Sequence, residues 1–249
     1  TAVALDSKGN LYLADEWLNR ISVFTRDGEF VSKWGTSGSG DGELKGPAGL
    51  AIDKNDNVFV VDAGNNRVQK FSLDGKFISN FGSFGSDDGQ FNNPWGISLD
   101  SEDHIYIADW RNDRIQKFSP DGQWEASIGS SGSGVGQLNR PNGLAVDADG
   151  DIYVADWMNN RVQVFAPDGR YITEFHGEAV LSKWGRDKLA SNPDMIRQRN
   201  LAFANDPNYE KGLAHPCGVR IDPQGRIVII DHTRNRLQVY IKEEEPALV

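Results

Sequence analysis

Histidine, cysteine and carboxylate side chains are the groups of this sequence that could hold a metal or catalyse a reaction. The chain has four histidines and one cysteine. His215, Cys217 and His232 are the set that could supply two imidazoles and a thiolate to one ion. No serine-nucleophile motif and no paired-carboxylate site is recognisable. We therefore assign no catalytic residue, no metal site and no cofactor, and we keep these three residues as the alternative metal ligands.

The stretch "DADGD" (147–151) resembles a calcium-binding loop because three acidic residues alternate with small ones. Its glycine is misplaced for an EF-hand, and no Glu follows at the twelfth position. The equivalent stretches "DSKGN", "DKNDN", "DSEDH" and "DPQGR" are not consistently acidic. The pattern therefore favours a hairpin turn.

The most regular charged residues are an Asp and an Arg that follows it five residues later. The pairs are Asp15 and Arg20, Asp62 and Arg67, Asp109 and Arg114, Asp156 and Arg161, and Asp231 and Arg236. Their first three intervals are 47 residues, and the last is 75. A ring of ligand-binding arginines is one interpretation. We favour a structural Asp–Arg clasp at a turn, because a residue found in every copy solves a folding problem that all copies share.

Each copy contains four short runs of strand type separated by turns. In the fourth copy the runs are "PNGLAVD", "IYVAD", "RVQVF" and "YITEF". They alternate apolar and polar residues or are continuously apolar, which predicts about four antiparallel strands. A single small sheet cannot bury both of its faces, so the sheets must pack on one another. We predict an all-β fold, a β-propeller of four-stranded antiparallel blades, with a linear β-solenoid as the alternative.

Glycine-rich segments such as "GSSGSGVGQLNRP" connect one copy to the next. They lack the Lys-Ser/Thr of a phosphate-binding loop, and a strand rather than a helix follows each. We interpret them as connections between blades.

The string P-x-G-[LI]-[AS]-[VIL]-D, followed by [YF]-[VIL]-[AV]-D-x-x-x-[ND]-R-[VI], D-G and G-x-G-[EQ]-[LF]-x-x-P, resembles the NHL repeat. The resemblance covers nearly the whole chain except about 176–214. It implies a propeller that is typically six-bladed, so a six-bladed parent and a five-bladed ring both stay open. NHL propellers include partner-binding scaffolds, RNA binders, receptor sensor domains and a few lyases, so function must come from the site.

The lyases of this family are expected to place zinc-binding histidines after the Pro of the P-x-G motif. That position holds Ala48, Trp95, Asn142 and Cys217 here. The chemistry of these enzymes, the peptide-amidating lyases, is therefore not expected. We predict a non-enzymatic binder, and a metal-dependent lyase or hydrolase resembling these enzymes remains the alternative.

We treat residues 1–249 as one propeller domain. The predicted boundaries are repeats at approximately 1–46, 47–93, 94–140, 141–175 and 215–249, and an insertion at 176–214.

Binding residues are expected where equivalent positions differ between copies. The residues after the motif Pro and after the shared Asp should converge on the top face of the central funnel. There the tryptophans could stack on a sugar ring or a peptide side chain, although they could equally pack between blades. The predicted ligand-binding residues are Trp95, Trp110, Asn142, Trp157 and His232.

The insertion is predicted to form short helices around 178–205. Val180, Leu181, Trp184 and Leu189 are spaced as one helical face, and Asn192-Pro193-Asp194 is typical of a helix start. The helices could form a lid, a docking surface or a cover for apolar side chains. With six basic and five acidic residues, 176–214 is the least negative part of the chain.

The net charge of −10 disfavours nucleic acid as a partner, because phosphate binding needs excess Lys and Arg. No apolar run is long enough to span a membrane, so no membrane insertion is expected. The expected partner is a protein, a peptide or a glycan, and the oligomeric state is left open. The chain lacks an initiator Met and a signal peptide, so we expect a trimmed N-terminus. The resemblance to plain bacterial NHL propellers favours an extracytoplasmic location.

Overall fold

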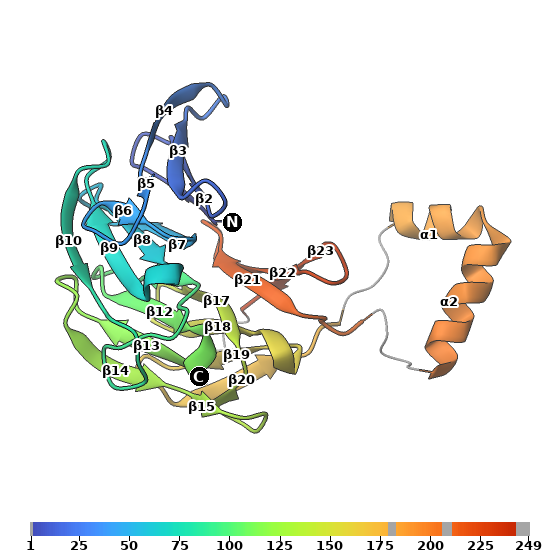
Figure 1. Cartoon of the computed structure of the whole chain (residues 1–249). Helices are drawn as coiled ribbons and strands as arrows, with labels where there is room; N and C mark the ends of the chain where they lie inside the picture. The colour runs from blue at the N-terminus through green and yellow to red at the C-terminus, as the bar shows by residue number, and fades with distance from the viewer. Residues whose placement is uncertain (1, 179–182, 206–210, 243–249) are drawn as a thin grey trace, which may run out of the picture.

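The computed structural model describes residues 2–178, 183–205 and 211–242. It contains five antiparallel sheets that follow one another around a common axis, and two short helices outside them (Figure 1). This confirms the predicted all-β propeller. The first four sheets have four strands, and the described part of the fifth has three. We call the sheets blades 1 to 5 in chain order.

The strands of the blades have the following bounds. Blade 1 contains β1 (Ala2–Leu5), β2 (Leu11–Asp15), β3 (Arg20–Phe24) and β4 (Phe30–Trp34). Blade 2 contains β7 (Pro47–Ile52), β8 (Val58–Asp62), β9 (Arg67–Phe71) and β10 (Phe77–Phe81). Blade 3 contains β11 (Ile97–Leu99), β12 (Ile105–Asp109), β13 (Arg114–Phe118) and β14 (Trp124–Ile128). Blade 4 contains β17 (Pro141–Val146), β18 (Ile152–Asp156), β19 (Arg161–Phe165) and β20 (Tyr171–Phe175). Blade 5 contains β21 (Pro216–Ile221), β22 (Arg226–Asp231) and β23 (Arg236–Ile241).

Smaller elements lie in the connections. Two parallel two-stranded sheets form within the glycine-rich segments, from β5 (Thr36–Ser37) with β6 (Glu43–Leu44) and from β15 (Ser130–Ser131) with β16 (Gln137–Leu138). One turn of 3-10 helix follows the second strand of blades 2, 3 and 4, as η1 (Ala63–Asn65), η2 (Trp110–Asn112) and η3 (Trp157–Asn159).

Apolar side chains on alternating strand positions hold successive blades together. Tyr12 and Ala14 of β2 are buried in one cluster with Val58 and Val60 of β8, whereas Leu13 points away from blade 2 and is exposed. The same period of two builds the clusters between blades 2 and 3, 3 and 4, and 4 and 5. Burial of these faces removes apolar surface from water, which is the main driving force for stacking the blades.

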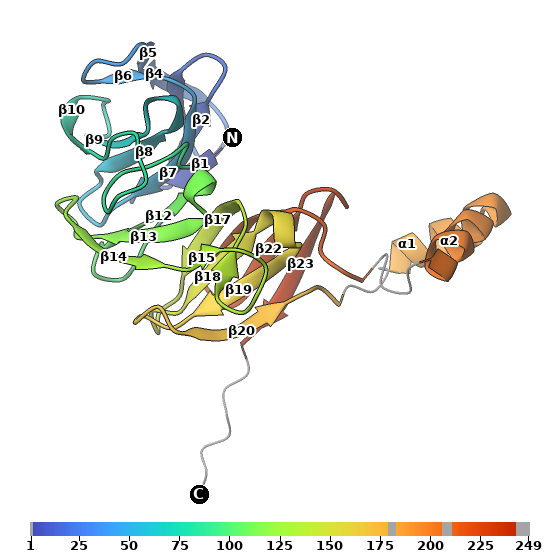
Figure 2. The same cartoon turned by 60° about the horizontal axis from the view of Figure 1, so that its bottom comes forward.

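Blades 1 and 5 each have one face without a neighbouring blade among the described residues (Figure 2). These faces border the remaining sector of the circle, and they carry large exposed apolar side chains. They are Val3, Leu5 and Leu13 in blade 1, and Ile230, Leu237, Val239 and Ile241 in blade 5.

The glycine of the P-x-G motif is required where the innermost strands approach one another. A Cβ on Gly96 would lie 2.4 Å from the carbonyl oxygen of Asn142, and a Cβ on Gly143 would lie 2.8 Å from that of Cys217. Backbone atoms cannot move aside cheaply, so only glycine permits this spacing. The innermost strands therefore form a narrow throat lined by main chain.

The Asp–Arg pairs form the predicted clasp, and the clasp joins two blades. In blade 2, Arg67 Nε donates to Asp62 Oδ2 at 2.8 Å, and the other oxygen of Asp62 accepts the amide of Lys45 from the connection that enters the blade. Arg67 also donates to the carbonyl oxygens of Gly40 and Glu43 in that connection. Asp62 is fully buried. The clasp thus fastens each incoming connection to the turn between the second and third strands.

The pattern recurs in blades 3, 4 and 5. Arg114, Arg161 and Arg236 each donate through Nε to the paired Asp, at 3.0, 2.9 and 2.7 Å. A buried glutamine two residues after each of these arginines, and after Arg67, also donates to the Asp. These are Gln69, Gln116, Gln163 and Gln238. A carboxylate with this many donors can be buried because each lone pair is satisfied.

Blade 1 has a looser clasp. Arg20 Nε lies 3.6 Å from Asp15 Oδ2, and both side chains are about 30 % exposed. Ser22 stands where the other blades have the glutamine. No described connection enters this blade to supply the amide and carbonyl partners of the clasp.

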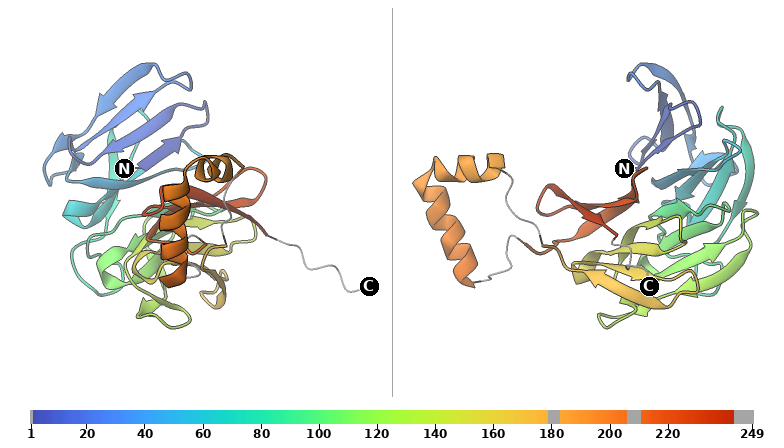
Figure 3. Two further views of the ribbon diagram at one scale, coloured as in Figure 1. Left: turned by 90° about the vertical axis from the view of Figure 1, so that its right-hand side faces the viewer. Right: turned by 180° about the vertical axis from the view of Figure 1, so that it is seen from behind.

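The insertion forms α1 (Lys183–Ala190) and α2 (Pro193–Asn205). The predicted start of α2 is confirmed, since Asn192 Oδ1 accepts the amide of Asp194 at 3.0 Å. The two helices pack on each other and stand away from the blades in Figures 1 and 2 and in the right-hand view of Figure 3, so they do not cover the funnel as a lid. Val180 and Leu181 of the predicted apolar face lie outside the described residues.

We predict that Asp62→Ala destabilises the protein far more than Asp15→Ala. Loss of Asp62 leaves the Arg67 guanidinium without its buried counter-charge, and breaking a buried ion pair in this way lowers the free energy of unfolding by about 3–5 kcal/mol. Asp15 is the matched position in the loose clasp, where the loss is about 1 kcal/mol or less. Urea denaturation followed by tryptophan fluorescence measures both free energies of unfolding. Equal losses in the two variants would contradict the structural role of the clasp.

Candidate functional site

Strand register brings the two sets of variable positions to the same end of the blades. Pro47 pairs with Asp62, Pro141 with Asp156 and Pro216 with Asp231. The residue after each Pro and the residue after each Asp therefore lie side by side at the top of the blade. This is the convergence that we expected from the sequence. We call this end the top rim.

The residues after the motif Pro surround the central funnel. Ala48, Trp95, Asn142 and Cys217 line one cavity of about 200 Å³, together with the glycines that follow them. Ligand pockets usually measure about 300–1,000 Å³. The funnel can admit part of a ligand, and the remainder must lie on the rim above it.

Four aromatic rings form a continuous row along the rim of blades 3, 4 and 5. The ring centroids of Trp95 and Trp110 lie 6.4 Å apart, those of Trp110 and Trp157 6.1 Å, and those of Trp157 and His215 5.2 Å. The rings are tilted by 38–50° to one another, and all four residues are half-buried. The structure thus brings together the three predicted tryptophans and adds His215. We call these residues the aromatic row.

Two guanidinium groups lie beside the centre of the row. The Arg140 guanidinium carbon is 4.8 Å from the centroid of the Trp110 ring, and that of Arg111 is 5.7 Å away. Both distances are within the range of cation–π attraction. A cationic patch therefore interrupts the rim of a protein that is strongly acidic overall.

Arg140 and His215 occupy an unusual backbone position. Each immediately precedes a motif Pro and has a left-handed conformation, with φ of 55° and 52°. Gly46 and Asn93 fill the same position in blades 2 and 3 and also have positive φ. Glycine and asparagine tolerate this conformation, whereas other side chains lose about 1–2 kcal/mol. Of these two energetically unfavourable residues, His215 belongs to the aromatic row and Arg140 lies beside it.

Two predicted ligand-binding residues and the alternative metal ligands lie around this row. Asn142 is in the funnel wall, and His232 is exposed on the rim. His215 Nδ1 lies 2.8 Å from the hydroxyl of Thr233, and burial raises the pKa of the Cys217 thiol. His215, Cys217 and His232 do not come together as a ligand group in the described part of the chain.

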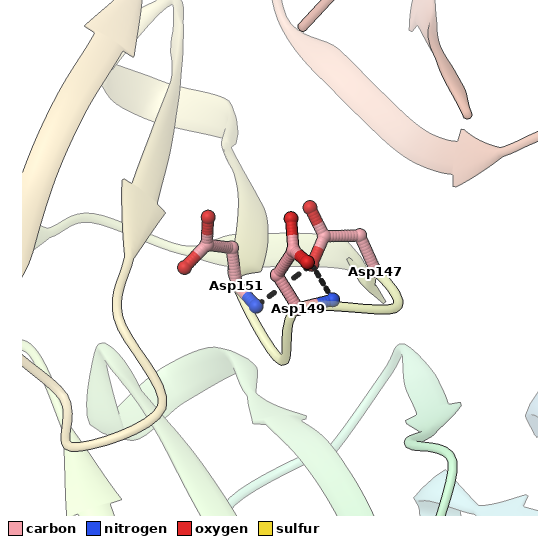
Figure 4. Close-up of side chains that lie close together, drawn as sticks. All are labelled: Asp147, Asp149 and Asp151. Atoms are coloured by element: carbon pink, nitrogen blue, oxygen red, sulfur yellow. Dashed lines mark hydrogen bonds between the residues drawn. The ribbon is translucent and has the colours of Figure 1, made fainter. Parts of the chain in front are cut away.

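The acidic turn is a hairpin turn, as predicted. Asp147 Oδ1 accepts the amides of Asp149 and Asp151 at 3.0 and 2.9 Å (Figure 4). The first Asp of each equivalent turn makes the same two hydrogen bonds, so this geometry belongs to the repeat. Ligand oxygens of the three aspartates nevertheless lie within 4.8 Å of one another, close enough to hold a metal ion.

An amino group already occupies the centre of these carboxylates. Lys242 Nζ lies 2.9 Å from Asp147, 2.7 Å from Asp149 and 2.8 Å from Asp151. Burial by itself lowers the pKa of Lys242, but the hydrogen bonds to the three carboxylates outweigh it and raise this pKa. The lysine is therefore charged at neutral pH and takes the place that a cation would need.

Sequence reasoning did not predict three residues of the rim as ligand-binding, although it kept one of them, His215, as an alternative metal ligand. Trp17 lies in the second-to-third-strand turn of blade 1 and is 87 % exposed. Arg140 and His215 precede the motif Pro, a position at which the copies carry Gly, Asn, Arg and His. A comparison of this position between copies would have found them, because it varies as strongly as the position after the Pro.

Two protein families match separate parts of the chain. Residues 4–81 match a family described as 6-bladed beta-propeller (DUF5128). Residues 91–118 and 138–165 each match the NHL repeat, at the third and fourth copies of the pattern. These matches confirm the resemblance to NHL-repeat β-propellers that the sequence predicts. No curated protein has a significant match to the sequence.

Solved structures with the same fold include enzymes. A catalytically inactive variant of virginiamycin B lyase from Staphylococcus aureus, solved with quinupristin, has a TM-score of 0.59 and 16 % identity, covering 96 % of this chain and 68 % of that one. A streptogramin B lyase has the same TM-score and identity, covering 98 % and 68 %. A protein of unknown function from Bacteroides caccae has a TM-score of 0.60 and 15 % identity, covering 92 % and 69 %. At this identity the similarity of the NHL propeller to these proteins concerns the fold alone. No described helix is long and apolar enough to cross a bilayer.

We predict that Lys242→Gln destabilises the propeller by on the order of 1 kcal/mol at low salt, because three clustered carboxylates lose their counter-charge. The loss should shrink at high salt, which screens their repulsion. Millimolar Ca²⁺ should raise the melting temperature of the variant more than that of the wild type. Lys8→Gln, in the equivalent turn of blade 1, is the control and should change little. Identical behaviour of the two variants would show that Lys242 does not neutralise the turn.

Proposed function

We propose that this NHL propeller is a non-enzymatic binding protein that engages a glycan through the aromatic row on its top rim. The single observation that carries the proposal is the continuity of Trp95, Trp110, Trp157 and His215. A row of ring faces on one side of the molecule suits a chain of flat units with apolar faces, and sugar rings have this form.

A glycan fits this rim better than a peptide does. Peptides usually bind by pairing with an exposed sheet edge or by placing side chains into pockets or grooves. The rim is built from turns, and the one described cavity beside the row measures about 200 Å³. Stacking on aromatic faces requires neither a free edge nor a deep pocket.

The clasp argues against RNA binding, because it occupies arginines that a phosphate backbone would need. Four arginines next to the rim are committed to fully buried aspartates. With a net charge of −10, the chain offers few free cations for a phosphate backbone. The alternative of a metal-dependent lyase or hydrolase draws support from the fold of the lyases above, but none from a ligand group at the funnel.

We predict that Trp110→Ala combined with Trp157→Ala abolishes glycan binding without unfolding the protein. Both rings are half-buried, so a moderate loss of stability is expected as well. Trp124→Ala, on the outer strand of blade 3, removes an exposed tryptophan away from the row and serves as the control. Binding is measured on glycan and peptide arrays, and folding by circular dichroism.

Three results would contradict this proposal. Unchanged binding in the double variant would exclude the aromatic row as the site. Binding to peptides alone would exclude the glycan. A metal retained after purification, together with turnover of a substrate, would favour the lyase alternative.

A further inference from the structure

Arg140 is the feature of the rim that the fold does not explain. Its backbone amide donates to Asp113 Oδ1 at 2.8 Å, and the amides of Gly46, Asn93 and His215 make the same bond to the previous blade. The fold therefore uses the main chain of this position and leaves the side chain free. Glycine or asparagine would serve the left-handed backbone better, so the arginine side chain itself needs an explanation.

The guanidinium of Arg140 is held over Trp110 but lacks an acceptor. Its Nη1 atom is buried and has no hydrogen-bond partner in the structure. It forms no ion pair among the residues that the structure describes. The neighbouring carboxylate of Asp113 is engaged elsewhere, with Oδ1 on the Arg140 amide and Oδ2 on the Ser131 hydroxyl at 2.7 Å. The clasp arginines of blades 2 to 5, in contrast, each donate to a carboxylate and to carbonyl oxygens.

A buried guanidinium N–H without an acceptor is costly, and its preferred acceptor is a planar anion that can accept two parallel hydrogen bonds. The cation–π contact with Trp110 holds the group beside the ring and so prepares it for such an acceptor. Arg111, on the same ring and without a described ion pair, adds a second positive charge. The site therefore has one aromatic floor and two cations at its centre.

We propose that the ligand of the aromatic row is an acidic glycan, whose sugar carboxylate is bound by Arg140 beside Trp110. This inference rests on the proposed function and specifies its ligand. The site takes one anionic group at a time, because its two cations both lie beside Trp110 and the chain as a whole carries a net charge of −10. A glycan with uronic acid residues fits this arrangement, whereas a densely charged polyanion would be repelled by the net negative charge of the protein.

The test compares uronic acid oligosaccharides with the same oligosaccharides after reduction of their carboxyl groups to alcohols. Titration calorimetry with the wild type should show about tenfold weaker binding of the reduced form, since one charge-assisted contact is lost. In the Arg140→Asn variant the two forms should bind equally well. Their common affinity should match that of the wild type for the reduced form.

Arg140→Asn is chosen because asparagine (Asn93) stands at the same position in blade 3. The substitution suits the left-handed backbone, so the melting temperature should stay the same or rise, and lost binding cannot then be attributed to misfolding. Asn93→Ala is the control variant, because it changes the equivalent position of blade 3. This variant should still bind the acidic oligosaccharide more tightly than the reduced one.

The outcomes separate this inference from the proposed function. If the wild type binds acidic and reduced oligosaccharides equally, and Trp110→Ala abolishes both, the glycan site stands and the role of Arg140 is wrong. If neither form binds, the glycan site itself is wrong. Binding of acidic peptides in place of oligosaccharides would also overturn the inference.

Discussion

The buried Asp–Arg clasp is the interaction on which the rest of this propeller depends. Asp62 and its equivalents accept hydrogen bonds from an arginine and a glutamine of their own blade and from an amide of the incoming connection. Apolar packing explains why blades stack, but it does not specify how one blade is positioned against the next. The clasp supplies that specificity because its geometry is satisfied only when the connection, the turn and the third strand meet.

The same constraint locates the surface available for function. Innermost strands that approach to backbone contact leave a funnel of about 200 Å³, and the clasp fixes the turns around its mouth. Around this mouth, the side chains that neither pack in the core nor form the clasp are those of the rim. The aromatic row, Arg111 and Arg140 all occur there, on elements whose main chain the frame already holds.

Much of the frame could be predicted from the sequence because each copy repeats the same solution. Comparison of the copies predicted the strands, the Asp–Arg pair and the hairpin turn at Asp147. The residue types at Asn192-Pro193-Asp194 predicted the start of the second helix. The rim was only partly predictable. The contact of Arg140 with Trp110 and that of Lys242 with three aspartates join residues of different blades, so no spacing within one copy encodes them. The helices themselves were predicted from their own sequence, but their place away from the blades was not.

The left-handed position before each motif Pro has a consequence for engineering and for divergence. Its amide is tied to the neighbouring blade, so the main chain keeps its course whatever side chain it carries, as Gly46, Asn93, Arg140 and His215 illustrate. These positions lie around the mouth of the funnel, and each can carry different side chains without a change in the main chain. Substitutions at these positions could change the binding specificity one residue at a time, with a modest and predictable loss of stability.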